Sequence, residues 1–245
     1  MRTIFRKTLI CLVAMFTVGA VASASASAAF KTEWQVCKEG GTEEFETHKC
    51  AKKATGGKWS WKSLTGTEQE KTTSRGREVT LAIGAKAVTC TAITDTGNIK
   101  AGGKGEATEI KLNGCLANAG KCTAESPKAA EGTIIIKGIP TQLVEREPSG
   151  GGTAKLANEL KENTTTKELF TLEVDEHGAA CPGFPNGRIK GQIAAEVINL
   201  ANGEVELNFP SPELKGNTLE YFGLAAKLIG KDEVSLENEW ASRGV

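Results

Sequence analysis

The chain has 245 residues, and its 30 basic and 30 acidic residues balance each other. Without a basic block it has no electrostatic surface of the kind that binds nucleic acid or anionic lipid, so we expect neither as a partner. Aromatic residues make up only 5% of the chain while glycine is abundant, a mixture that favours strands joined by tight turns.

Residues 1–29 have the order of a secretory signal peptide. Three basic residues precede an apolar stretch over 9–22, and the small-residue sequence Ala26-Ser27-Ala28 follows it. The apolar stretch is short for a membrane-spanning helix, which needs about 20 apolar residues, so an uncleaved anchor is the weaker alternative. We therefore expect cleavage after Ala28 or Ala29, a mature chain of net charge −3 without a membrane span, and an extracellular or cell-envelope location.

The cysteines indicate disulfides. Of the seven, Cys11 lies in the leader and six remain, an even number typical of an exported, cross-linked chain. Zinc binding is the weaker alternative, because C-x-x-C is absent from the sequence and only two histidines occur, so we expect neither a metal nor a cofactor. Pairing is open on sequence alone; short separations favour two local bonds and leave one long-range bond, in the order Cys37–Cys50, Cys115–Cys122 and Cys90–Cys181.

The segment 30–66 is expected to form a small disulfide-stapled module in front of the main domain. Three of the four tryptophans lie in it, namely Trp34, Trp59 and Trp61. If Trp59-Ser60-Trp61 is a strand, its two indole rings lie on one face. An exposed pair would stack on a sugar or anchor a partner protein, which makes the three tryptophans our candidate ligand-binding residues. The alternative is that the rings form the core of the module or attach it to the main domain.

Residues 67–245 are expected to form a main β domain. Val79, Leu81 and Ile83 alternate with polar or small residues, and the apolar phase then flips, which predicts a bulge or kink near Ala87. The glycine-rich segment 102–105 predicts a hairpin loop, since a phosphate-binding loop needs Ser or Thr after its lysine. Further strands are predicted at 109–112, 134–136 and 170–174.

The second half of the chain contains one predicted helix and two predicted hairpins. Leu156 and Leu160, four residues apart, favour a short helix over 154–161. Asn202-Gly203 is a preferred hairpin turn. The two-residue loop places Leu200 opposite Val205 and Ile198 opposite Leu207, and the parity upstream then requires a second bulge near Val197–Ile198. A last pair is expected at 219–229 and 234–240, around a turn at 230–232. Many short strands without alternating helices predict an all-β fold, an antiparallel β-sandwich or barrel.

The span 88–240 resembles a group of secreted, cysteine-containing, β-rich proteins of soil actinobacteria. The matching motifs are Val88-Thr89-Cys90, Leu112-Asn113-Gly114-Cys115, Lys121-Cys122-Thr123, the strand ending at Cys181 and the tail 234–239. The front segment from Trp34 through Cys50 is similar to a recurrent module of the same proteins. The resemblance implies a β-rich secreted architecture and implies no activity, because the group has no known function.

Two functions follow from these patterns. Neither a nucleophile elbow nor an H-E-x-x-H motif occurs, so we expect a secreted, non-enzymatic β-domain that binds an extracellular ligand or surface partner, or has a structural role. The alternative is a secreted hydrolase that uses His177, in Asp175-Glu176-His177-Gly178, with a nearby carboxylate. A polar turn explains the same four residues, and a charged loop explains His48.

Overall fold

The structure is a computed structural model that describes residues 31–41, 44–176, 179–209, 214–238 and 241–245. The predicted leader, including Cys11, and His177 lie outside the described residues. Within these ranges the secondary structure is almost all antiparallel strand, so the all-β prediction is confirmed. The same ranges contain no helix with the length and apolar character needed to cross a membrane.

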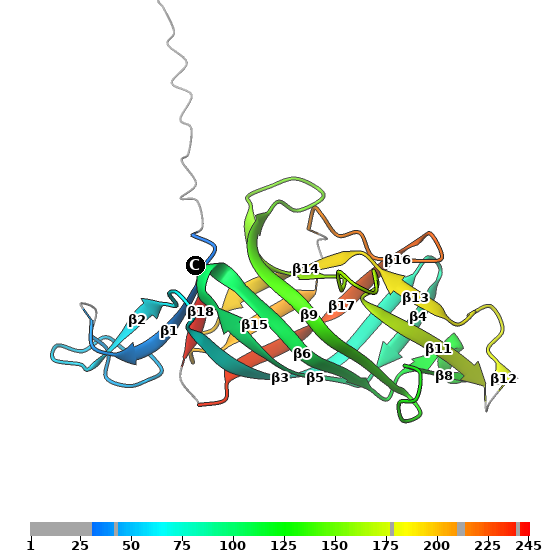
Figure 1. Cartoon of the computed structure of the whole chain (residues 1–245), viewed down its shortest axis with the longest axis horizontal. Coiled ribbons are helices and arrows are strands. Elements are labelled where there is room, and N and C mark those ends of the chain that lie inside the picture. The colour runs from blue at the N-terminus through cyan, green and yellow to red at the C-terminus, as the bar shows by residue number, and fades with distance from the viewer. Residues whose placement is uncertain (1–30, 42–43, 177–178, 210–213, 239–240) are drawn as a thin grey trace, which may run out of the picture.

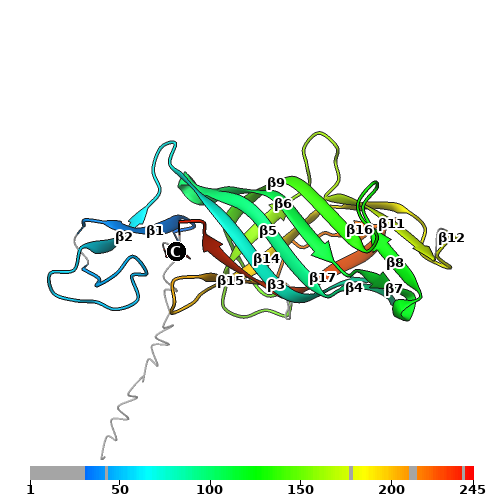
Figure 2. The ribbon, with the colours of Figure 1, turned by 90° about the horizontal axis from the view of Figure 1, so that it is seen from below.

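A small three-stranded sheet lies at one end of the molecule (Figure 1). Its central strand β1 (Trp34–Glu39) pairs with β2 (Trp59–Ser63) on one edge and with β18 (Ser242–Gly244) on the other. The last strand of the chain therefore completes the sheet that the first strand begins. β12 lies at the opposite end of the long axis in all three views (Figure 2).

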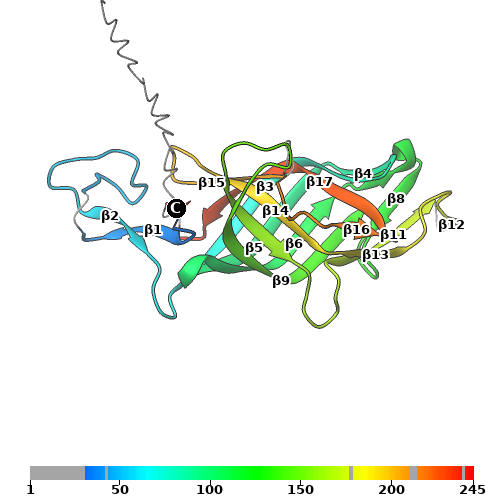
Figure 3. The same cartoon turned by 90° about the horizontal axis from the view of Figure 1, so that it is seen from above.

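Eight described strands beside this small sheet form a closed antiparallel ring, here called the first ring (Figure 3). It closes because β17 pairs with β3, in addition to the neighbours that each strand has along the sheet. A Cβ on Gly244 of β18 would lie 2.7 Å from Leu156 Cδ2, so the small sheet packs directly against this ring. In spatial order the members are β3 (Gln69–Ile83), β5 (Ala92–Lys100), β6 (Lys104–Asn113), β9 (Thr133–Arg146), β10 (Lys155–Lys161), β14 (Gln192–Asn199), β15 (Val205–Phe209) and β17 (Leu224–Leu236).

A second ring of described strands shares β3 and β17 with the first. The far halves of these two strands are joined by a chain of short strands that again returns to its start. The additional members, in spatial order, are β4 (Lys86–Cys90), β7 (Leu116–Ala117), β8 (Cys122–Glu125), β11 (Phe170–Glu176), β13 (Gly187–Lys190) and β16 (Glu220–Tyr221), while β12 (Ala179–Ala180) extends β11. The short 3₁₀ turns are η1 (Ala101–Gly103) and η2 (Asn118–Gly120).

An irregularity in β3 marks the boundary between the two rings. Gly76 lies opposite Asp232, but Val79 lies opposite Gly230, so β3 has one residue more than β17 between these pairs. The extra residue reverses the side-chain parity of β3, as a bulge does, at the point where its other neighbour changes from β5 to β4. A Cβ on Gly76 would lie 2.1 Å from the Lys231 carbonyl oxygen, so the close approach here requires glycine.

The predicted helix at 154–161 is wrong, because these residues form β10. A spacing of four residues between Leu156 and Leu160 places both on one face of a strand as well as of a helix. β10 is covered on both faces, with Leu156 and Leu160 on the side of Asn158 and with Ala157 packing against Leu214 on the other side. A strand buried on both faces lacks polar alternation, and its pattern is easily taken for a helix.

The predicted bulge near Ala87 and the predicted turn at 230–232 both have a structure other than the one that we predicted. The phase flip near Ala87 is a tight hairpin, since Ile83 pairs with Lys86 across Gly84-Ala85. The turn predicted at 230–232 is instead an uninterrupted part of β17, opposite the bulge in β3. The glycine-rich segment 102–105 lies at the β5–β6 connection through η1, as predicted.

The Asn202-Gly203 hairpin forms, but with a register one residue away from the predicted one. Asn199 lies opposite Val205 and Val197 opposite Leu207, so the connection spans 200–204. We predicted a second bulge near Val197–Ile198, but the β14–β15 register is regular there. No bulge is needed, because Val197 is on the buried face and Ile198 is half-buried on the outer face. The longer loop allows Gly203 to pack against Ala241, where a Cβ would lie 2.3 Å from the alanine methyl.

The disulfides confirm one predicted pair and correct the other two. Cys115–Cys122 and Cys90–Cys181 are wrong, because the β7–β8 register aligns Cys115 with Ala124 instead of Cys122. The β4–β7 register pairs Thr89 with Leu116, and it therefore places Cys90 beside Cys115 at the ends of these two strands. The three bonds are Cys37–Cys50, Cys90–Cys115 and Cys122–Cys181.

Candidate functional site

A partly open cavity of about 50 Å³ lies in the first ring, beside the small sheet. One buried water needs about 10–15 Å³ on the same measure, so the volume suits a guest of a few non-hydrogen atoms. Strands β5, β6, β15 and β17 contribute apolar side chains to its wall, and Trp34 and Ser242 contribute from the small sheet. The polar lining residues are Thr72, Asp95, Asn98, Glu106, Thr141, Asn158 and Ser242.

A pair of carboxyl groups forms part of this wall. Ser74 of β3 lies between Asp95 of β5 and Asp232 of β17, because β5 and β17 flank β3. The Ser74 hydroxyl donates to Asp232 Oδ2 at 2.6 Å, and its oxygen accepts from the backbone N–H of Asp95 at 3.0 Å. Asp95 faces the cavity, and Asp232, which is 1% exposed, lies behind it.

The surroundings of this pair favour a bound proton. Burial, together with the charge of nearby Asp95, raises the pKa of Asp232 to about 9. Burial also raises the pKa of Asp95, although hydrogen bonds with Asp232 and Ser74 act in the opposite direction. At neutral pH the pair therefore keeps a proton on Asp232 and carries at most one negative charge.

Two residues of the cavity wall have a buried polar atom without a hydrogen-bond partner among the described residues. The atoms are Trp34 Nε1 and Asn158 Oδ1, and the exposed fractions of these residues are only 4% and 7%. Oδ1 of Asp232, next to the wall, is a third such atom. Asn98 Oδ1 is also unpartnered, but Asn98 is three residues from Asp95 and lies on the opposite face of β5. A buried polar atom without a partner costs about 1–3 kcal/mol, so a polar guest in the cavity would be stabilising.

The charge of the wall is acidic. In the part of the chain that the structure describes, the lining contains no Lys, Arg or His. Glu106 is one of several lining residues that are partly exposed: its side chain is 41% exposed and pairs with Lys100 at 3.3 Å. The rim at the β5–β6 bulge is thus neutralised, whereas Asp95 has no cationic lining residue to compensate it.

The structure separates the three tryptophans that the sequence grouped together. Trp34 is buried and faces the cavity, while Trp59 and Trp61 are half-buried against the cluster around the Cys37–Cys50 disulfide. The guanidinium carbon of Arg243 lies 4.4 Å from the Trp61 ring centroid. A ligand-binding role for Trp59 and Trp61 stays a prediction, now with Arg243 covering one of the rings.

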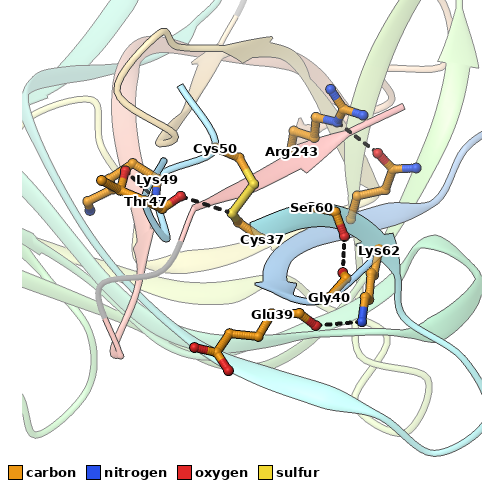
Figure 4. The surroundings of a disulfide bond; sticks show 10 residues. Cys37, Glu39, Gly40, Thr47, Lys49, Cys50, Ser60, Lys62 and Arg243 are labelled. Atoms are coloured by element: carbon orange, nitrogen blue, oxygen red, sulfur yellow. Dashed lines mark hydrogen bonds between the residues drawn. A yellow bond between two sulfur atoms is a disulfide. The ribbon is translucent and has the colours of Figure 1, made fainter. Parts of the chain in front are cut away.

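The Cys37–Cys50 disulfide holds the loop before β2 against β1 (Figure 4). Around it, Lys62 Nζ donates to the Glu39 carbonyl oxygen at 2.7 Å, and the Ser60 hydroxyl donates to the Gly40 carbonyl. These bonds fix the small sheet from which Trp34 reaches the cavity. His48 packs edge-on against Trp59, with ring centroids 5.7 Å apart.

The acidic pair is absent from our sequence-based candidates. Asp232 fell in a predicted turn, and Asp95 fell in a polar stretch outside every predicted strand. The usable signal was parity: Asp95 is two residues from buried Ile93 and therefore lies on the same face of β5.

Comparison of the chain with family models, with curated proteins and with solved structures gives no match.

Proposed function

We propose that the protein is an exported, non-enzymatic binding protein that holds a small polar ligand inside its first ring. The observation that carries the proposal is the pair of unpartnered buried atoms, Trp34 Nε1 and Asn158 Oδ1, on the wall of a cavity that Asp95 also faces. Native proteins pair nearly all their buried polar groups, so two such atoms beside one acidic cavity indicate a site made for a polar guest. Closed rings of eight strands are a known geometry for enclosing one small ligand.

The size of the cavity favours binding over catalysis on a large substrate. A volume of about 50 Å³ admits a few non-hydrogen atoms and excludes a peptide or sugar polymer from Asp95 and Asp232. A hydrolase of such polymers needs its carboxyl groups in an open cleft on both sides of the scissile bond.

Export is supported by the covalent structure. Three disulfides join six cysteines of the described chain, and such bonds persist in oxidising compartments such as the periplasm or the extracellular space. Together with the predicted leader they support a location outside the cytoplasm.

The test is calorimetric titration of the oxidised protein with small solutes: ethylene glycol, glycerol, ethanolamine, methylammonium and acetate. Asn158→Leu removes one unpartnered oxygen and fills the cavity, while Gln69→Leu makes the same kind of change at an exposed position of the same ring. We expect at least one solute to bind the wild type and the Gln69→Leu variant with 1:1 stoichiometry. The same solute should not bind the Asn158→Leu variant. Absence of binding to the wild type, or equal binding to Asn158→Leu, would show that the cavity is not a ligand site.

A further inference from the structure

The hydrogen-bonding groups of the cavity include both acceptors and donors. Asn158 Oδ1 and the carboxyl oxygens of Asp95 accept hydrogen bonds, and the Trp34 N–H is an unpartnered donor. The hydroxyls of Thr72, Thr141 and Ser242 can do either. A complementary guest therefore carries at least one donor for Asp95 and one acceptor for Trp34.

The charge inventory selects further among such guests. Asp95 faces the cavity without a cationic lining residue, and its neighbour Asp232 is a second carboxyl group and supplies no positive charge. A buried carboxylate is strongly destabilised unless an opposite charge or several donors compensate it. An ammonium group supplies one positive charge and three donors at once.

Resting on the function proposed above, we propose that the ligand is a small primary amine with a hydroxyl or ether oxygen. The ammonium group lies against Asp95 and its oxygen accepts from Trp34 Nε1–H. A two-carbon hydroxyalkylamine has four non-hydrogen atoms, which agrees with the cavity volume of about 50 Å³. The indole ring of Trp34 adds a surface that attracts cations.

A metal cation is the main rival guest. The described residues contain no group of three or more His, Cys, Asp or Glu side chains that could hold a metal ion. Calcium takes six to eight oxygen ligands, typically including several carboxylates, whereas the inner wall presents the single carboxyl group of Asp95. The indole N–H of Trp34, moreover, presents a donor that no metal ion can use.

The experiment compares ethanolamine with ethylene glycol, in which a hydroxyl replaces the ammonium group, at constant ionic strength by calorimetric titration. We expect ethanolamine to bind the wild type about tenfold or more tightly than ethylene glycol, as a charge-assisted hydrogen bond should provide. Asp95→Asn should remove this preference, while the matched charge control Glu233→Gln, at an exposed position of β17, should keep it. Circular dichroism and melting curves verify that each variant is folded.

Trp34→Phe provides a second route that does not depend on Asp95. It keeps an aromatic ring and removes the N–H, so the affinity for ethanolamine should fall several-fold. The affinity for methylammonium, which has no oxygen, should stay unchanged. A uniform loss for both amines would point to a damaged cavity and would overturn the assigned orientation.

The outcomes separate this inference from the proposed function. If ethylene glycol or glycerol binds as tightly as ethanolamine and Asn158→Leu abolishes it, the binding function stands and the amine is wrong. If calcium or potassium chloride displaces ethanolamine with 1:1 stoichiometry, the site belongs to a metal ion and the amine is again wrong. If no solute binds the wild type, both proposals fail.

Discussion

The two rings share β3 and β17 but have opposite interiors. In the first ring β3 contributes Thr72 and Ser74 to the inside, beside Asp95 and the cavity. In the second ring the same strand contributes the apolar side chains Val79, Leu81 and Ile83. One strand thus passes from a polar to an apolar interior, and the extra residue between Gly76 and Val79 is the structural break between them.

This difference indicates a division of roles. The second ring is cross-linked by two of the three disulfides, Cys90–Cys115 and Cys122–Cys181. The first ring contains the unpartnered atoms Asn158 Oδ1 and Asp232 Oδ1, which destabilise it in the absence of a guest. We infer that the second ring supplies much of the stability that allows the first to keep a binding cavity.

The largest expected effect comes from removing a staple of the second ring. Cys122 and Cys181 are 59 residues apart, so the double change Cys122→Ala and Cys181→Ala should cost about 4 kcal/mol in the chain-entropy model. The corresponding change at Cys37 and Cys50, which are 13 residues apart in the small sheet, should cost about 3 kcal/mol. Urea unfolding of the oxidised proteins measures both, and a larger loss for the small sheet would contradict this order.

A smaller effect is expected from truncating one leucine in each ring. Leu81→Ala in the second ring should cost about 3–4 kcal/mol, because this side chain is 1% exposed and packed on all sides. Leu207→Ala in the first ring should cost about 2 kcal/mol, because Leu207 already borders the cavity and loses fewer contacts.

Urea midpoints of the two variants, measured with unchanged m-values, give the comparison directly. Equal losses would mean that the first ring is packed as tightly as the second. The cavity would then be too small to matter for ligand binding.

The same contrast explains what could be predicted from sequence. The apolar alternation of Val79, Leu81 and Ile83 identified a strand, because the interior it faces is apolar. The preceding half of β3, from Gln69, carries Thr72 and Ser74 on its inner face and shows no apolar period, so its strand was recognised only from about residue 76. Polar interiors look like surface or turn in a single sequence, and for this reason Asp95 and Asp232 were missed.

Long-range pairing was also beyond a local reading. The disulfide partners depend on ring closure, which sets β4 beside β7 and β8 beside β11. Only Cys37–Cys50, closed within the small module, follows from proximity in the sequence. Covering Ala157 required segments far along the chain, and that cover is what turned the helix-like pattern of 154–161 into a strand.

The smallest effect, and the one most specific to the polar interior, is the pH dependence of stability. The folded chain keeps the Asp232 proton up to a pKa of about 9, whereas the unfolded chain releases it near about 4. Between these values the folded state binds more protons, so this group makes stability fall as pH rises, by at most about 1.4 kcal/mol per pH unit. Asp232→Asn mimics the protonated carboxyl group and should remove this fall.

Urea unfolding at pH 6 and pH 7 tests this expectation. From pH 6 to pH 7, the free energy of unfolding of the wild type should fall by about 1 kcal/mol relative to that of Asp232→Asn. The reason is that only the wild type has the Asp232 proton, which the folded state binds and the unfolded state releases. Glu145→Gln, at an exposed position of β9, should follow the wild type. Parallel pH profiles for wild type and Asp232→Asn would mean that Asp232 is ionised in the folded protein. The wall of the first ring would then carry two negative charges, and a divalent cation would become a better match for it than an amine.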